Sequence, residues 1–444
     1  MKTLISAVGG AAAVAGCVAG LLWLGPSPAR PGATAPAAAT ATTGTDNAGG
    51  GSRDRDTAGS GSGSGSGDTV DAARRRTEAY PDDPTAWTVL ARAAIERART
   101  TLDAGPLDIA DQALRRSLAL DGSRNYGAVT GLGMLANARH EFAEAREHAL
   151  RGTRMAPDRP DAYAVLADAE IQLGHYPAAR AAVQRLLDIA PASAAYSRAA
   201  YDLETHGRPT DAAIALRRAV DSAATPDERA FAEARLGDLL GSGGDLDKAE
   251  RHYRRALDAV PDHPYGQAGI ARVTAARGET DAARALYGKL VARTPLPQFL
   301  LEAVEVRRAS GAPGLGGEGA ALAAQVRLAR ADGGPVDPHL ALYAADHGDP
   351  QVAVELMRRE WQHTRGVVVA DALGWALHRA GRSEEALPYA VRAAGTGWRN
   401  ALFRYHRGAI ERELGMPEAA GHLREATALN PHFTPPPPRA ERND

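Results

Sequence analysis

The sequence predicts an all-α fold, an α-solenoid of about nine to ten stacked helical hairpins, because three kinds of residue recur at one interval. Prolines recur at nearly equal spacing, at Pro157, Pro191, Pro226, Pro261 and Pro295. Glycine and alanine keep a similar interval within and beyond this stretch. Since stacked repeats bury their faces against neighbours, a chain of 444 residues needs no single central core.

Glycine marks the turn inside each predicted hairpin. A glycine suits the left-handed turn that ends the first helix, and a small alanine shortly after it lets the second helix pack closely against the first. The pairs are Gly174 and Ala179, Gly207 and Ala212, Gly244 and Ala249, Gly278 and Ala283, Gly348 and Ala353, Gly381 and Ala386, and Gly415 and Ala420.

The motif Pro-Asp-x-Pro marks the start of a unit at three places, 81–84, 157–160 and 261–264. Its first proline cannot continue the preceding helix. Its second proline suits the first position of a new helix, where the missing N–H has no helical partner to lose. No alternating strand pattern competes with this assignment, and aromatic residues make up only 5% of the chain.

These patterns resemble the tetratricopeptide repeat family, whose unit of about 34 residues favours Leu at position 7, Gly or Ala at 8, Ala at 20, a large residue at 24, Ala at 27 and Pro at 32. The resemblance covers roughly residues 83–432 and implies helix-turn-helix hairpins that bind a protein or peptide partner. The unit that starts at Ala230 matches with Leu236, Gly237, Ala249, Tyr253, Ala256 and Pro261, and the next unit matches with Ile270, Ala271, Ala283, Tyr287 and Pro295.

Composition divides the chain into six segments. A signal or anchor segment at 1–29 precedes a linker at 30–68, which is rich first in Pro, Ala and Thr and then in Gly and Ser. The repeats form an N-terminal array at 69–310 and a C-terminal array at 320–432, separated by a glycine-rich break at 311–319 where we expect a bend. A proline-rich tail at 433–444 is expected to be disordered.

The N-terminal segment predicts a location outside the cytoplasm. Lys2 supplies positive charge before an apolar stretch at 4–24 that is long enough to span a bilayer, and Pro26 ends it. Three fates stay open: a retained transmembrane anchor, cleavage after Ala29 with secretion, or lipidation of Cys17 in a motif that resembles a bacterial lipobox. We therefore expect a protein that is associated with the cell membrane or secreted.

The sequence offers no signal for catalysis, cofactors or metal binding. Cys17 is the only cysteine, so the array can hold neither a disulfide nor a thiolate metal site. His140 and His148 lack the HExxH spacing of zinc enzymes, and the GxGxxG match at 314–319 follows a helix-like stretch and not a strand. With 52 basic and 54 acidic residues the chain has no general attraction to nucleic acid. We expect a protein that is not an enzyme.

The resemblance also predicts which side chains face a partner, because positions 5, 9, 12 and 13 of each first helix line the concave side of such arrays. The first six units then offer a mildly acidic groove, and the last two offer an aromatic and basic patch of the kind that anchors interfaces. The alternative for Trp375 is packing between the ninth and tenth units. The predicted concave residues are Met134, Asn137, Asp168, Ile171, Tyr201, Glu204, Asp238, Arg272, Trp375, His378, Arg379, Tyr405 and Arg412.

One known binding mode of the family is absent. Members that hold chaperone carboxyl termini present Lys and Asn at positions where this chain has Thr88, Arg92, Thr130 and Met134. The function expected from the sequence is therefore a non-catalytic scaffold that binds another protein or peptide outside the cytoplasm, tethered to the membrane. The alternative is an assembly subunit of a cell-envelope enzyme or transporter complex.

Overall fold

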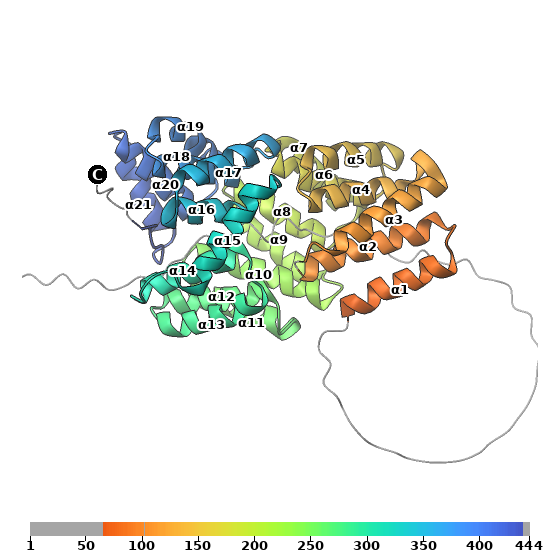
Figure 1. Cartoon of the computed structure of the whole chain (residues 1–444), viewed down its shortest axis with the longest axis horizontal. Helices are drawn as coiled ribbons and strands as arrows, with labels where there is room; N and C mark the ends of the chain where they lie inside the picture. The colour runs from red at the N-terminus through yellow and green to blue at the C-terminus, as the bar shows by residue number, and fades with distance from the viewer. Residues whose placement is uncertain (1–64, 102, 438–444) are drawn as a thin grey trace, which may run out of the picture.

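The computed structural model describes residues 65–101 and 103–437, and the regular structure in these ranges is entirely helical (Figure 1). The first part comprises α1 (Gly65–Ala79), α2 (Pro84–Thr101), α3 (Pro106–Asp121), the 3-10 turn η1 (Gly122–Arg124), α4 (Tyr126–Ala138), α5 (Phe142–Met155), α6 (Pro160–Gln172), α7 (Tyr176–Ile189), α8 (Ser193–Thr205), α9 (Pro209–Asp221), α10 (Pro226–Ser242) and α11 (Leu246–Ala259). The second part comprises α12 (Pro264–Ala276), α13 (Thr280–Arg293), α14 (Pro297–Ala309), α15 (Gly316–Asp332), α16 (Pro338–His347), α17 (Pro350–His363), α18 (Val367–Arg379), α19 (Ser383–Ala394), α20 (Ala401–Glu413) and α21 (Ala419–Leu429).

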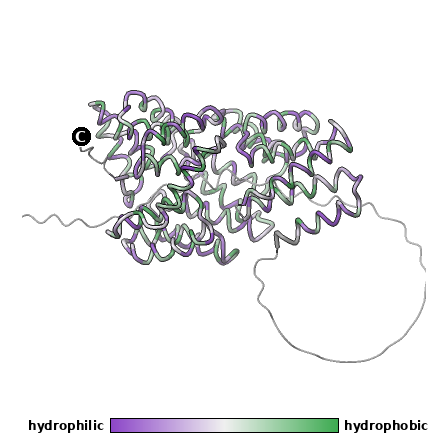
Figure 2. Tube along the Cα trace, in the orientation of Figure 1, coloured by the Kyte–Doolittle hydropathy of each residue, from purple (hydrophilic) through white to green (hydrophobic). Residues whose placement is uncertain are grey.

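The helices pair into consecutive hairpins, from α2 with α3 to α20 with α21, and α1 packs on α2. In the described residues this makes ten hairpins, which confirms the predicted α-solenoid. The second proline of each Pro-Asp-x-Pro motif begins a helix, at Pro84, Pro160 and Pro264. Figure 2 shows apolar and hydrophilic residues mixed along each helix, as expected where every helix has one buried stripe.

The predicted glycine turns are present with one exception, and one of the predicted alanines is displaced. Most of the seven glycines have the left-handed conformation, for example Gly174 with φ 74° and Gly278 with φ 85°. Gly348 does not, because its φ is −127° and its N–H instead ends α16 by donating to the carbonyl of Ala344. The last unit is shifted by one residue, since Ala419 is buried while the predicted Ala420 is exposed.

Two segment boundaries differ in detail from those expected. The glycine-rich stretch 311–319 is only in part a break, because α15 already begins at Gly316. Residues 433–437 of the proline-rich tail, which we expected to be disordered, lie against the C-terminal hairpins. The anchor or signal segment, Cys17 and the linker up to residue 64 lie outside the described residues. Within the described ranges, none of the helices has the length and apolar character needed to cross a bilayer.

The array coils until its C-terminal hairpins meet its third hairpin, where α17 lies next to α7 (Figure 1). The backbone N–H of Arg365 donates to the carbonyl of Gln172 at 2.9 Å. The N–H of Val367 donates to the hydroxyl of Tyr176, also at 2.9 Å. We call this meeting of residues 172–176 with 364–367 the closing contact.

An apolar cluster surrounds the closing contact. It joins Ile171 of α6 and Tyr201 of α8 to Val367, Trp398 and Phe403 of the C-terminal hairpins. The rings of Tyr201 and Trp398 meet edge to face, with centroids 6.1 Å apart. Burial of these apolar side chains stabilises the return of the superhelix onto itself.

Glycine is required at this contact for a second reason besides its left-handed φ. A Cβ atom at Gly174 would lie 2.6 Å from the carbonyl oxygen of Arg365, and one at Gly207 would lie 2.6 Å from that of Gly397. Gly278 occupies the same turn position in a later hairpin, but a Cβ atom there would meet nothing within 4 Å. The close approach is therefore specific to the hairpins that take part in closure.

We predict that Gly174→Ala opens the superhelix, whereas Gly278→Ala does not. Both variants force alanine into a left-handed conformation, which costs about 1–2 kcal/mol. Only Gly174→Ala also displaces Arg365, so it lowers the melting temperature further and increases the radius of gyration measured by small-angle X-ray scattering. Equal melting temperatures and equal radii for the two variants would contradict the closing contact.

Candidate functional site

The inner side of the superhelix carries a series of charged and histidine side chains that link the first helices of consecutive hairpins. Every junction from α6 to α20 contains one such pair, and we call the series the inner ladder. The pairs are Asp168 with Arg198 (2.6 Å), Glu204 with Arg235 (3.0 Å), Asp238 with Arg272 (2.6 Å), Arg272 with Glu302 (3.3 Å), Glu305 with His347 (2.6 Å), Asp346 with Arg379 (3.1 Å) and Asp371 with His406 (2.8 Å).

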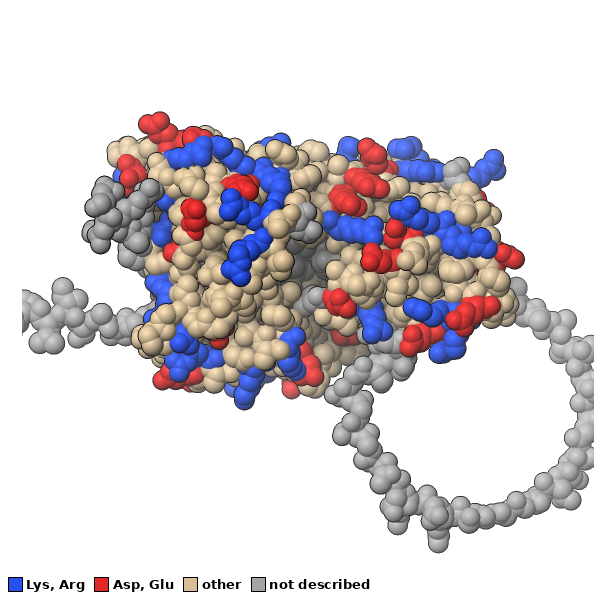
Figure 3. Space-filling model, viewed as in Figure 1, with Lys and Arg blue, Asp and Glu red and all other residues tan. Residues whose placement is uncertain are grey.

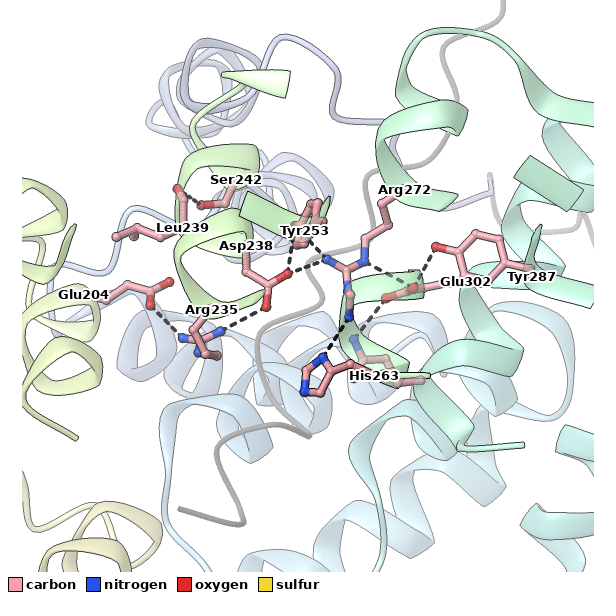
Figure 4. Close-up of polar contacts among 12 residues, drawn as sticks. Glu204, Arg235, Asp238, Leu239, Ser242, Tyr253, His263, Arg272, Tyr287 and Glu302 are labelled. Atoms are coloured by element: carbon pink, nitrogen blue, oxygen red, sulfur yellow. Dashed lines mark hydrogen bonds and ion pairs between the residues drawn. The ribbon is translucent and has the colours of Figure 1, made fainter. Parts of the chain in front are cut away.

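Arg272 lies at the centre of the ladder, between Asp238 on one side and Glu302 on the other (Figure 4). The hydroxyl of Tyr253 donates to Asp238 at 2.9 Å, and that of Tyr287 donates to Glu302 at 2.8 Å. Burial by itself lowers the pKa of Arg272, but the charges of Glu302 and Asp238 outweigh it and raise the pKa well above its usual value. Arg272 therefore remains a cation although its side chain is only 11% exposed.

At two carboxylates of the ladder, by contrast, burial outweighs the nearby charges and determines the direction of the pKa shift. It raises the pKa of Glu204, although the charge of Arg235 opposes the shift. It also raises the pKa of Asp346 to about 6, against the charges of Arg379 and His406. Desolvation thus outweighs pairing at both residues, because a carboxylate inside the protein loses its water on all sides.

A recess opens beside Arg272, where the inner side of the middle hairpins faces the C-terminal end of the array. Its volume, including the open mouth, is about 710 Å³. One wall comes from α10 to α12, the other from the loop between α19 and α20, and residues after α21 complete it. The residues that matter for its chemistry are Asp238, Ser242, Tyr253 and Arg272 on the first wall, Trp398 and Asn400 on the second, and Asn430, His432 and Phe433 after α21.

Arg272 keeps one hydrogen-bond donor without a partner. Its Nη2 group is buried and has no hydrogen-bond partner among the described residues. A buried guanidinium donor without a partner is costly, so this group does not add to the stability of the charge cluster. Trp398 and Tyr253 line the recess but are themselves buried.

The structure separates the predicted concave residues into three groups. Glu204, Asp238 and Arg272 line the recess. A second group is buried in contacts between hairpins, and a third is at least partly accessible at the C-terminal end. The second group is Met134, Asn137, Asp168, Ile171, Tyr201, Trp375 and Arg379, and the third is His378, Tyr405 and Arg412.

Trp375 packs between the ninth and tenth hairpins, which is the alternative that the sequence left open. Its side chain is 2% exposed, and its Nε1–H donates to Asp346 at 3.0 Å. Its ring stacks on His406 of α20 with centroids 4.0 Å apart. Trp375 therefore stabilises the junction and has no free face for a ligand. His378, one turn later, is hydrogen bonded to the hydroxyl of Ser383 at 2.9 Å.

Several residues of the site are not predicted from the sequence. Arg235 and Glu302 could have been found, because each is separated from its partner, Glu204 or Arg272, by nearly one repeat length. Trp398, Asn400 and the residues after α21 could not, because only the closed superhelix brings them opposite α10 and α12.

The histidines do not form a metal pair. His148 approaches Glu144 at 3.4 Å, whereas the ring of His140 stacks on Phe142 with centroids 5.4 Å apart. His140 takes the turn position that Gly174 has in the next hairpin, with a left-handed φ of 61°. Over the part of the chain that the structure describes, no group of three or more metal-ligating side chains occurs. The GxGxxG stretch spans the end of the turn between α14 and α15 and the start of α15.

Charges of both signs are interspersed over the outer face seen in Figure 3, on the N-terminal and the C-terminal hairpins alike. Many of these belong to exposed pairs such as Arg358 with Glu385 at 2.9 Å. Such pairs contribute little to stability, typically below about 1 kcal/mol, because water screens them. The strongly coupled charges lie on the inner side.

We predict that Arg272→Gln destabilises the middle hairpins far more than Arg277→Gln. The first change leaves Glu302 buried without a cation and Asp238 with Arg235 alone, which costs roughly 3–5 kcal/mol. Arg277 pairs with Asp247 and Glu250 at a side chain that is 33% exposed, so its loss costs about 1 kcal/mol or less. Hydrogen exchange of α10 to α14 measures both effects. Similar exchange rates in the two variants would show that the ladder is not a structural element.

Comparison with known proteins identifies the repeats. The tetratricopeptide repeat family matches residues 130–194 and 234–296. The chain is 30% identical over 163 residues to cellulose synthase operon protein C of Pseudomonas fluorescens (strain SBW25), and 27% identical over 206 residues to cellulose synthase 1 operon protein C of Komagataeibacter xylinus. These matches cover 34% and 46% of the chain but only 12% and 13% of the relatives, so the matched region spans about an eighth of their length.

Solved structures of similar proteins include PilW, described as a widely conserved type IV pilus biogenesis factor, with a TM-score of 0.40 and 20% identity. That match covers 46% of this chain and 94% of PilW. Another is a thermophilic repeat protein of Thermus thermophilus, with a TM-score of 0.36 and 18% identity over 42% of this chain and 98% of that one. Residues 130–194 and 234–296, with the hairpins that they form, are therefore tetratricopeptide repeats.

Proposed function

We propose that this protein is a non-catalytic scaffold that binds a segment of a partner protein in the recess beside Arg272. The observation that carries the proposal is the recess itself, where the inner side of the middle hairpins faces the C-terminal end and Arg272, Ser242 and Asn400 supply polar groups to the lining.

The chemistry of the recess favours a main-chain carbonyl as the acceptor. Arg235 and Arg272 are already surrounded by three carboxylates, those of Glu204, Asp238 and Glu302. A further carboxylate would be repelled by these charges, whereas a neutral carbonyl oxygen would not. An extended peptide presents such carbonyls at regular intervals.

A second function is favoured by the relatives. The chain is similar to the two cellulose synthase operon proteins, and such a likeness is consistent with a subunit needed to assemble a cell-envelope enzyme or transporter. In that case the protein would hold one fixed partner, and the recess would be part of a permanent interface. The two functions differ in how many partners the recess contacts.

We further propose that the scaffold acts outside the cytoplasm and is tethered to the membrane by its N-terminal segment. The apolar stretch at 4–24 and the linker at 30–68 support this proposal. Fractionation of cells with and without residues 1–29 tests it. We expect the full chain in the membrane fraction and the shortened chain outside it, and equal distributions would contradict the tether.

Photocrosslinking in cells tests the binding function. A photoreactive amino acid at Ala276, which lines the recess, is expected to capture a partner protein. The same residue at Arg217, exposed on the outer helix α9, serves as the control and is expected to capture none. Mass spectrometry of the products identifies what is bound.

Three outcomes are distinguishable. Many different segments captured at Ala276 would support a general peptide-binding scaffold. One stoichiometric protein would favour the assembly subunit. Capture that is absent at Ala276, or equal at both positions, would contradict binding in the recess.

A further inference from the structure

The chain continues beyond α21 as an extended segment that crosses the inner side of the array. Asn430 is buried and redirects the chain, because its side-chain oxygen accepts the N–H of His432 at 2.9 Å. Pro431 then packs against the turn between α10 and α11, with its Cδ atom 2.8 Å from where a Cβ atom of Gly244 would lie. His432 and Phe433 line the recess. We call residues 431–437 the tail segment.

Two side chains of the C-terminal hairpins hold the rest of the tail segment. The ring of Phe433 packs on that of Tyr405 in α20, with centroids 5.5 Å apart. The Nη1 group of Arg379 in α18 donates to the carbonyl of Pro437 at 2.9 Å. Arg379 is itself fixed, because its Nε group pairs with Asp346 at 3.1 Å and its guanidinium lies over the ring of Trp375. The donor is thus oriented whether or not the tail is present.

The composition of the tail segment explains this kind of contact. Prolines at 435–437 restrict φ to a narrow range and have no N–H, so this stretch stays extended and offers only carbonyl acceptors. Proteins that recognise such segments use aromatic surface together with hydrogen-bond donors to the carbonyls. Tyr405 supplies the aromatic surface and Arg379 supplies the donor.

The tail segment adds little to the packing of the array. Pro435 is exposed, while Phe433 and Pro437 are only half-buried. Phe433 belongs to none of the apolar clusters found in the described residues, whereas Tyr405 packs against the cluster of the C-terminal hairpins without it. The tail can therefore leave its place while the hairpins keep their cores.

We propose that Arg379, Tyr405 and the adjoining recess form a docking site for an extended proline-rich segment of a partner protein, which residues 431–437 occupy as an intramolecular ligand. This inference rests on the proposed scaffold function and specifies the chemistry of its partner. A covalently attached ligand acts at an effective concentration in the millimolar range, so a partner must compete with the tail. The tail thereby sets the affinity and concentration that a partner needs in order to bind.

The test uses a fluorescent peptide with the sequence of residues 431–437. Fluorescence anisotropy measures its binding to the full chain and to a chain that ends at Asn430. We expect the shortened chain to bind the peptide and the full chain to bind it at least about tenfold more weakly, because its own tail competes. Circular dichroism and melting show whether the shortened chain remains folded.

Matched variants separate docking from folding. In the full chain, Phe433→Ala is expected to release the tail and increase peptide binding, whereas Pro435→Ala at an exposed position should leave binding unchanged. In the shortened chain, Tyr405→Ala is expected to abolish peptide binding, whereas Glu413→Ala at the exposed end of α20 should not.

The result that would overturn the proposal is a shortened chain that melts like the full chain but does not bind the peptide, or equal binding by both chains. A dimer of the full chain that disappears on truncation would instead assign the site to the tail of a second copy and would also overturn it. Partner capture at Ala276 together with failure of the peptide to bind would leave the scaffold function intact and reject this partner chemistry alone.

Discussion

The closing contact between residues 172–176 and 364–367 is the interaction on which the rest of the structure depends. In an open solenoid each repeat touches only its neighbours, so its inner side faces water along the whole length. The hydrogen bond from Arg365 to Gln172 instead joins hairpins that are far apart in the sequence. It brings Trp398 and the tail segment opposite Arg272, and thereby converts part of an open groove into a recess.

The inner ladder explains how an array of hairpins reaches this contact. Each pair joins the first helices of two neighbouring hairpins, so it constrains their relative rotation at every junction from α6 to α20. Buried charges contribute specificity more than net stability, because an arrangement that separates them leaves a charge without compensation. We infer that the ladder fixes the pitch of the superhelix, and that the pitch brings α17 back to α7. Asp238 and Arg272 of the ladder also line the recess, so the same residues hold the array together and form part of the proposed binding surface.

The helices could be predicted from the sequence because their signals are local. Helices begin at Pro84, Pro160 and Pro264, where proline fixes φ, and a left-handed glycine such as Gly278 ends one. Neither signal depends on residues elsewhere in the chain. The site could be predicted only in part. Asp238 and Arg272 follow from the register of their helices, whereas for Trp375 the sequence allows either a concave position or packing between the ninth and tenth units, and the structure shows the packing. The closing contact links Thr364 to Gln172 across 192 residues, and no periodic pattern encodes such a pair.

The most direct measurement of closure is a distance between the two segments that meet. Because Cys17 is the only cysteine, a variant with Cys17→Ser accepts a pair of spin labels at new cysteines in place of Ala178 on α7 and Gln362 on α17, both of which are exposed. Electron–electron double resonance should give one short and narrow distance distribution, because the ends of these helices are joined by hydrogen bonds. A long or broad distribution would show an open solenoid and would contradict the account.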